Sequence, residues 1–456
     1  MKTVNKKVTA ERLVRDALEK ARHFEDYNIF TFLNEEGALK KAREIDKRIA
    51  AGEDVGRLAG VPYALKDNFS SPEGQTTASA HILEGYNSPI TATAVEKLEA
   101  EGAIMIGRTN MDAFAHGSST ENSYYGPTLN ACDRERVAGG SSGGSAVAVA
   151  LDIVEFATGT DTGGSIRQPA SFNGVFGFKP TYGCISRYGV VAMASSTDCV
   201  GFFTKTPDDM DLLMSITSGK DSKDLTTLDD YYNDSETKKV KTIGIIKDFD
   251  NESVDAEIRE ALHDKCELLK SKGYEIVELE MPALKYGLPA YYIIVPAEVA
   301  SNLSRYDGVR YGFRSKDSED LDALYLNTRS EGFMPENKRR IMIGNFVLSS
   351  GFYDEYFLKA AKARTLIVQE YEKAFEKCDF ILTPVSPTPA FKLGEKVNDP
   401  VAMYFEDVMS VPLNLAGIPG LAIPVGETKK GLPIGLQLVG PRRSDKALIE
   451  FSREIM

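Results

Sequence analysis

The amino-acid sequence predicts an α/β fold, and three observations support this prediction. Short segments typical of buried strands alternate with segments of helical periodicity along much of the chain. Turns rich in glycine and proline cluster in two regions, Gly60 to Gly189 and Thr383 to Pro441. The 456 residues are enough for a large core, so length alone allows two or three domains or one large α/β unit.

The N-terminal half begins with two expected helices between Thr9 and Gly52, with Thr9 as the N-cap of the first. Apolar residues recur there at helical spacing: Leu13, Val14, Ala17, Leu18 and Ala21. The segments GVPYALKD and GAIMIGRT are typical of short buried strands, and TATAVEKLEAEG is the expected helix between them. A small-residue helix is expected to begin at SSGGSAVAVAL, and DIVEFATGTD is the next expected strand.

The C-terminal half begins with a polar stretch from Ser215 to Lys241, which indicates an excursion on the surface. A second strand–helix–strand unit follows, made of KTIGIIKD, a helix from Val254 to Lys272, and YEIVELE. Helical patterns continue from Leu288 to Lys377. The segments DFILTPVSP, GLAIPVG and LPIGLQLVG then predict strands, and a terminal helix is expected after them.

Charge and composition exclude several classes of function. The net charge of −13 and a pI of about 5.1 argue against a long basic groove for nucleic acid. The five cysteines form no CxxC pair and have no zinc-type spacing, so we expect reduced thiols, no metal site and a cytoplasmic protein. No signal peptide is apparent, and no apolar run approaches the roughly 18 residues of a membrane span.

The stretch AGGSSGGSAVAVAL contains two overlapping G-x-S-x-G windows, which raises three interpretations. A Ser-His-Asp hydrolase needs a histidine after this elbow, and only His263 follows it, within a helical pattern. A Walker-type phosphate loop needs a lysine after the glycines, and none is present. The glycines could also serve only close packing, and this stretch alone does not decide the question.

Two further features indicate a nucleophile and a base. In GTDTGGSIRQP, two glycines precede Ser165, so a sharp turn could direct the N–H groups of residues 162–165 at one point, as an oxyanion hole requires. Lys66 ends an apolar strand. An exposed lysine has a pKa of about 10.4, but burial can lower it by up to about 3–5 units, which makes a neutral lysine available as a general base.

The segment from Gly139 to Pro169 resembles the amidase signature, whose catalytic set is Ser-cisSer-Lys. The resemblance implies that Ser165 is the nucleophile, that Ser141 bridges after a cis Gly140–Ser141 bond, and that Lys66 is the base. It implies one large amidase-signature fold, a central mixed β-sheet with helices on both sides. Ser142 is expected to support the hydrogen-bond network, and Asp161 and Arg167 are expected to form a pair that holds the turn. The expected oxyanion donors are the N–H groups of Thr162, Gly163 and Gly164.

The resemblance extends from about Ala10 to the C-terminus, and it is strongest to the glutamine-hydrolysing chains of tRNA-dependent amidotransferases. Segments such as GSSTENSYYGPTLN, SNLSRYDGVRYG and LSSGFYDEYF carry it. In that family a Tyr, an Arg and an Asp hold glutamine, and these map onto Tyr291, Arg340 and Asp407. One amidase domain over 1–456 is implied: N-terminal helices (1–55), the signature core (56–210), an inserted substrate-pocket region (240–380) and C-terminal strands with a helix (381–456).

The same resemblance implies partners and cofactors. Ammonia released from glutamine would pass to a B subunit, where ATP-activated Glu-tRNA(Gln) becomes Gln-tRNA(Gln), and a small C subunit would complete a heterotrimer. ATP, Mg²⁺ and the mischarged tRNA would belong mainly to the B subunit, and this chain itself needs no cofactor. A stand-alone amidase for another small amide and a non-catalytic scaffold remain as alternatives.

Overall fold

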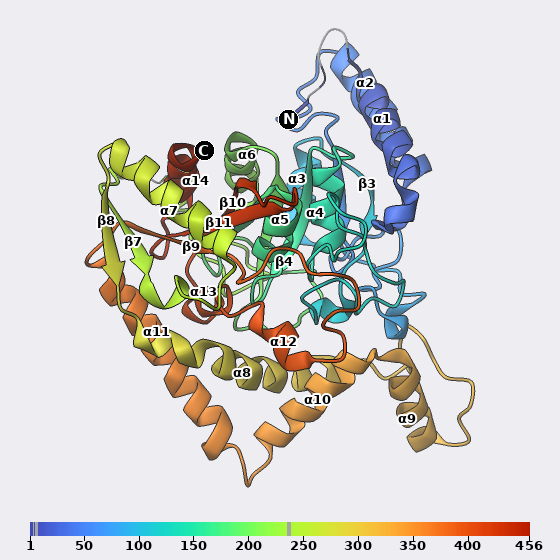
Figure 1. Ribbon diagram of the computed structural model, residues 1–456. Coiled ribbons are helices and arrows are strands. Elements are labelled where there is room, and N and C mark those ends of the chain that lie inside the picture. Colours follow the sequence, from blue (N-terminus) through green and yellow to red (C-terminus); the bar gives the residue numbers. More distant parts are fainter. Residues whose placement is uncertain (3, 5–7, 235–238) are drawn as a thin grey trace.

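The computed structural model describes residues 1–2, 4, 8–234 and 239–456, and Figure 1 shows how they are arranged. The described residues form one 11-stranded mixed sheet with helices on both faces. Its order is β1 (Phe30–Leu33), β3 (Ile104–Thr109), β2 (Pro62–Lys66), β4 (Phe156–Asp161), β6 (Cys199–Thr204), β5 (Phe176–Lys179), β10 (Gly420–Glu427), β11 (Pro433–Val439), β9 (Phe380–Pro384), β7 (Thr242–Ile246) and β8 (Glu275–Leu279). The predicted α/β architecture is therefore confirmed.

The helices divide into three groups. On one face of the sheet are α3 (Thr93–Ala100), α6 (Pro207–Thr217), α7 (Ala256–Ser271) and α14 (Asp445–Ile455). On the other are α1 (Ala10–His23), α2 (Glu35–Ala50), α4 (Gly143–Ala150) and α5 (Arg167–Asn173). A third layer lies beneath these in Figure 1, and it contains α8 (Gly287–Asn302), α9 (Leu321–Gly332), α10 (Pro335–Leu348) and α11 (Lys359–Phe375), with α12 (Pro400–Phe405) and α13 (Val411–Ala416) alongside.

Alternation along β2 explains how the two faces differ. Tyr63 and Leu65 pack into the layer with α3 and α6, whereas Ala64 faces the layer with α4. Side chains of successive strand residues point to opposite faces, so one strand serves two cores. The small residue on the second face lets α4, itself made of glycine, serine, alanine and valine, lie close to the sheet.

Most elements agree with the sequence analysis, and some differ. Thr9 caps α1 by accepting from the Arg12 N–H, as expected, but β1 interrupts the region in which only two helices were predicted. The strands β5 and β6 were also not predicted. The expected polar excursion begins inside α6 and continues without helix or regular strand through Asp234, and residues 235–238 lie outside the described part.

The described residues contain neither a membrane-spanning helix nor a cluster of metal-ligating side chains. None of the described helices combines the length and the apolar composition that crossing a membrane requires. Within the same residues, no group of three or more His, Cys, Asp or Glu side chains is arranged to hold a metal ion.

Candidate active site

The parallel pairing of β2 with β4 brings the predicted base and nucleophile to one edge of the sheet. Lys66 is the last residue of β2, and Ser165 lies in the turn that follows β4 and precedes α5. Carboxyl ends of parallel strands meet at the same edge. Ser141 and Ser142 immediately precede α4, and the expected cis Gly140–Ser141 bond is present.

Lys66 is fully buried, and its amine has three hydroxyl partners. Its Nζ donates to Oγ of Ser141 (2.9 Å), to Oγ of Ser142 (2.7 Å) and to Oγ1 of Thr160 (2.8 Å). Burial lowers the pKa of Lys66 to about 7, although the carboxylates of Asp112, Asp161 and Asp198 favour its charged form. The site therefore contains a lysine that can be neutral near pH 7.

Ser165 is half-buried, and its hydroxyl makes no hydrogen bond with any residue that the structure describes. Its carbonyl oxygen accepts from the Ser142 N–H at 3.2 Å, which ties the turn to the start of α4. The contact between Lys66 and Ser141 is thus formed, while the Ser141 and Ser165 hydroxyls are not hydrogen-bonded to each other. The Ser165 hydroxyl is left free to meet a ligand.

A buried ion pair holds the turn that carries Ser165. Asp161 accepts from Arg167 through both carboxylate oxygens (3.0 and 3.1 Å), and neither side chain is exposed. Burial opposes ionisation of Asp161, but the Arg167 charge outweighs it, and the pKa of Asp161 is lowered to about 2. The expected pairing of these two residues is present.

The backbone N–H groups of the turn differ in whether they already have a hydrogen-bond acceptor. Gly164 N–H donates to Asp161 Oδ1 at 2.9 Å, so this predicted oxyanion donor already has an acceptor. The N–H groups of Thr162, Gly163 and Ser165 have no acceptor among the described residues. Gly164 has φ +141°, and a Cβ there would lie 2.3 Å from Ser410 Oγ, so only glycine fits this position.

Three residues that the sequence analysis missed surround Arg167. Its Nη1 donates to Ser410 O (3.0 Å) and Gln437 Oε1 (2.9 Å), and its Nη2 donates to Asn414 Oδ1 (2.6 Å). Ser410 Oγ also donates to Gly163 O at 2.6 Å. The C-terminal part of the chain therefore fixes the turn from outside the signature segment.

Two of the three predicted substrate-binding residues, Tyr291 and Asp407, lie beside the same turn. Tyr291 on α8 and Arg340 on α10 are buried, and Asp407 follows α12. The Tyr291 hydroxyl lies 2.6 Å from the position a Cβ would take on Gly163, and Asp407 Oδ1 lies 3.6 Å from the corresponding position on Gly164. We call Tyr291, Arg340 and Asp407 the clamp residues.

Tyr292 connects two of the clamp residues, and Ser118 contacts one of them. Tyr292 donates to Asp407 Oδ2 (3.3 Å), and the Arg340 guanidinium lies 5.3 Å from the centre of its ring. Ser118 also donates to Asp407 Oδ2, at 2.6 Å. Burial raises the pKa of Asp407 to about 7, while the Ser118 hydrogen bond and the Arg340 charge oppose the increase.

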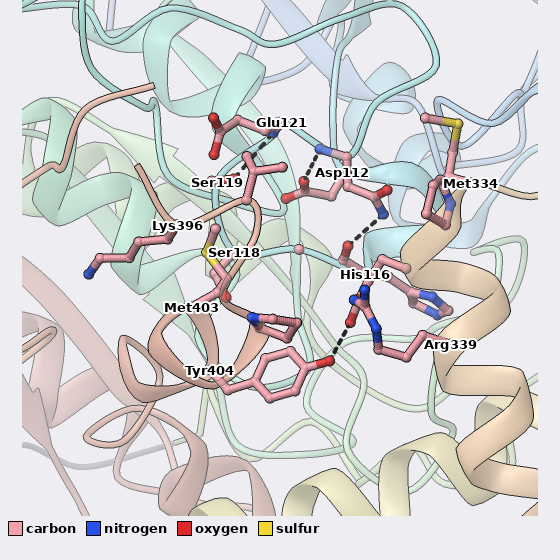
Figure 2. A pocket seen from close by; sticks show the side chains of 16 residues that line it. Asp112, His116, Ser118, Ser119, Glu121, Met334, Arg339, Lys396, Met403 and Tyr404 are labelled. Atoms are coloured by element: carbon pink, nitrogen blue, oxygen red, sulfur yellow. Dashed lines mark hydrogen bonds and ion pairs between the residues drawn. The ribbon is translucent and has the colours of Figure 1, made fainter. Parts of the chain in front are cut away.

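A pocket of about 240 Å³ opens beside the clamp residues, and Figure 2 shows it from close by. Ser118 lines this pocket and also contacts Asp407, so it stands between the open space and the buried site. Asp112 lines it as well, and its backbone N–H donates to Ser141 O at 3.3 Å. The pocket thus adjoins both the clamp residues and the bridging serine.

The histidine that a Ser-His-Asp interpretation would need lies elsewhere. His263 is on α7 with a side chain 60% exposed, and it pairs with Asp250 at 2.7 Å. It hydrogen-bonds to no serine among the described residues. The triad interpretation is therefore rejected.

The chain is similar to known proteins over most of its length. A family model described as Amidase matches residues 12–449. The chain is 49% identical over 443 residues to the A subunit of glutamyl-tRNA(Gln) amidotransferase from Cyanothece sp., covering 96% of this chain and 92% of the relative. It is 50% identical over 428 residues to the protein of the same name from Carboxydothermus hydrogenoformans, covering 93% and 88%.

Two solved structures also match nearly the whole chain. The crystal structure of the glutamyl-tRNA(Gln) amidotransferase A subunit from Thermotoga maritima matches with a TM-score of 0.79 and 37% identity, covering 98% of this chain and 91% of that one. A crystal structure described as an amidase matches with a TM-score of 0.84 and 32% identity, covering 98% and 96%.

Proposed function

This chain belongs to the amidase family, and from that membership we propose that it hydrolyses the side-chain amide of glutamine by a Ser-cisSer-Lys mechanism. The ammonia released would serve a tRNA-dependent amidotransferase. The observation that carries the proposal is the buried Lys66 amine on the Ser141 hydroxyl, at the strand edge that also carries Ser165. Buried lysines with a pKa lowered toward 7 are typical of functional sites.

In the first step, neutral Lys66 accepts the proton of Ser141, and Ser141 accepts the proton of Ser165. Ser165 Oγ then attacks the carbon of the glutamine side-chain amide, and its C=O electrons move to the oxygen. The N–H groups of Thr162 and Gly163 receive the resulting oxyanion, and that of Gly164 joins them if it leaves Asp161. Rotation of the free Ser165 hydroxyl toward Ser141 would complete the relay.

In the second step, the C–N bond breaks, and Lys66 returns a proton through Ser141 to the leaving nitrogen, which departs as ammonia. A glutamyl ester remains on Ser165. Water attacks this ester with the same lysine as base, and glutamate and the free serine hydroxyl are restored. Each proton that Lys66 takes up is therefore given back within the cycle.

The clamp residues supply recognition in this proposal. Arg340 can bind the α-carboxylate of glutamine with two parallel hydrogen bonds, and ionised Asp407 can accept from the α-ammonium. Tyr291 bounds the space over Gly163, so it would position the side-chain amide. The relatives named as amidotransferase subunits support this choice of substrate.

The same names support assembly with other subunits. We propose that ammonia passes to a B subunit, which holds ATP and Mg²⁺ and binds the mischarged tRNA, and that a C subunit completes a cytoplasmic heterotrimer. The net charge of −13 agrees with leaving most tRNA contact to a partner.

Formation of glutamate from glutamine tests the core of the proposal. Replacement of the nucleophile in Ser165→Ala should lower the rate by a factor of about 10⁴ or more, because no covalent intermediate can form. His263→Ala is the matched control and should leave the rate unchanged. Activity near that of the wild type in Ser165→Ala would refute the mechanism and would favour a scaffold role.

A reconstitution separates the amidotransferase component from a stand-alone amidase. The chain is mixed with candidate B and C subunits, glutamine, ATP and Glu-tRNA(Gln) or Asp-tRNA(Asn). We expect formation of the corresponding amidated tRNA with at least one of the two. Hydrolysis of glutamine without amidation of either tRNA would favour the stand-alone amidase.

A further inference from the structure

Arg340 is a buried cation whose orientation needs an explanation. Only 2% of its side chain is exposed, and its guanidinium lies over the rings of Tyr292 (5.3 Å) and Tyr404 (5.6 Å). These two rings stack on each other with centres 3.8 Å apart. Aromatic faces attract a cation, but they do not fix the rotation of a planar guanidinium. A directional partner must supply that.

Glu336 provides this directional contact. It lies one helical turn before Arg340 on α10, so both side chains are on the same face of the helix. Its Oε1 accepts from Arg340 Nε at 2.8 Å and from the Tyr404 hydroxyl at 2.7 Å, the latter drawn as a dashed line in Figure 2. Its Oε2 accepts from Arg339 at the pocket wall.

The contact with Glu336 uses only the Nε edge of the guanidinium. Of the two terminal nitrogens, Nη2 has one long contact, to Gly117 O at 3.4 Å, and Nη1 has no acceptor among the described residues. These two nitrogens form one of the edges through which a guanidinium binds a carboxylate with two parallel hydrogen bonds. The terminal nitrogens of Arg340 therefore keep hydrogen-bonding capacity that a substrate could use.

We propose that Glu336 is a positioning residue: it holds the Nε edge of Arg340 so that both terminal nitrogens face the α-carboxylate of the substrate. This inference rests on the proposed function, because it concerns how that function selects an α-amino acid amide. Glu336 also keeps the buried guanidinium paired when no substrate is bound, which avoids an isolated charge in the interior. Tyr404 in turn fixes the carboxylate of Glu336.

The opposite role is that Glu336 competes with the substrate for Arg340, and the two roles predict opposite changes. If Glu336 positions Arg340, its removal lets the guanidinium rotate, and glutamine binds more weakly. If Glu336 competes, its removal frees Arg340, and glutamine binds more tightly. The sign of the change in KM therefore decides between them.

The experiment compares Glu336→Ala, Glu336→Gln and the wild type on two substrates, glutamine and butyramide. Butyramide has the same reacting amide but neither α-carboxylate nor α-ammonium. In Glu336→Ala we expect the KM for glutamine to rise about 10- to 100-fold, the loss typical of a charge-assisted hydrogen bond, with kcat within about threefold. The kcat/KM for butyramide should stay within about twofold, because it does not use Arg340.

Two variants besides Glu336→Ala complete the design. Glu336→Gln keeps an oxygen that can accept from Arg340 Nε and the Tyr404 hydroxyl, so its KM should lie between those of the wild type and Glu336→Ala. It also serves as the test variant if Glu336→Ala does not fold. Glu331→Ala is the matched control, because the carboxylate of this exposed acid on α9 accepts only from Ser315 (2.9 Å) among the described residues, and the KM of the variant should not change.

Three results would overturn the inference alone: an unchanged KM for glutamine, a lower KM, or an equal loss of activity on both substrates, which would indicate general damage to the fold. A wild-type enzyme that hydrolyses butyramide but not glutamine would refute the proposed function, and this inference with it. A rise in KM for glutamine, partly reversed in Glu336→Gln and absent with butyramide, would support it.

Discussion

Raising the pH from 6 to 8 should accelerate attack by Ser165, because the base must be deprotonated to accept a proton. Burial lowers the pKa of Lys66 to about 7 despite the nearby carboxylates of Asp112, Asp161 and Asp198. A lysine with that pKa is neutral in about one tenth of molecules at pH 6, about half at pH 7 and about nine tenths at pH 8. The rate should therefore rise about tenfold over these two pH units.

The size of the shift in the Lys66 pKa also explains why burial matters to the mechanism. An exposed lysine of pKa about 10.4 would be neutral in only roughly one molecule in 2,500 at pH 7. Burial of Lys66 therefore increases the available base about a thousandfold at neutral pH. The hydroxyls of Ser141, Ser142 and Thr160 then hold the amine without requiring that it be charged.

The assay is kcat/KM for butyramide between pH 5.5 and 9, which reports the ionisation of the free enzyme. Butyramide is chosen because the pKa of Asp407 is also raised to about 7, so the glutamine profile contains a second group in the same range. We expect a rising limb with a midpoint near pH 7 for butyramide and a steeper limb for glutamine.

Lys66→Arg tests the assignment of this limb, since its guanidinium stays protonated over the whole range. The variant should be nearly inactive, and any residual activity should lack the limb. A butyramide profile that is flat from pH 6 to 8 in the wild type, or the same limb in Lys66→Arg, would refute the assignment of Lys66 as the base.

Much of the sheet around the site could be predicted from the sequence. The strands β2 and β3 are short segments rich in apolar residues, with a helix of clear periodicity between them, and parallel strands buried on both faces have that pattern. The strand β1 was missed because it has only four residues. The strand β5 was missed because it also has only four residues, and it pairs with β10, some 240 residues later in the chain. Local patterns do not encode a partner at that distance.

The residues of the site, like the strands, could be predicted from the sequence only in part. Ser141 and Ser165 stand in one signature segment and Lys66 ends a predicted strand, whereas Ser410 and Asn414 reach the turn only through tertiary packing. Gln437 did leave a signal, as one polar residue within the apolar strand LPIGLQLVG. A fully buried polar side chain must have a partner, and Gln437 accepts from Arg167 at 2.9 Å. An isolated polar residue in an apolar strand therefore indicates a buried polar contact before the fold is known.

Two further predictions concern the turn itself. Asp161→Asn should lower the free energy of unfolding by about 3–5 kcal/mol at pH 7, because it leaves Arg167 buried without its counter-ion. The pKa of Asp161 in the folded protein is about 2, below the ordinary value of 3.8. Ionised Asp161 therefore adds about 2 kcal/mol to the free energy of unfolding above pH 4, and this contribution is lost as the pH falls toward 2. Urea unfolding at pH 7 and pH 3 measures the effect of the substitution and its pH dependence. A decrease in the free energy of unfolding of less than about 1 kcal/mol at pH 7 in Asp161→Asn would contradict the role of the pair. Gly163→Ala should reduce glutamine hydrolysis by at least about tenfold, because the new Cβ would lie 2.6 Å from the Tyr291 hydroxyl and must displace it from the turn. Gly351→Ala, where a Cβ meets open space, is the control, and equal activity of the two variants would show that Tyr291 need not contact the turn.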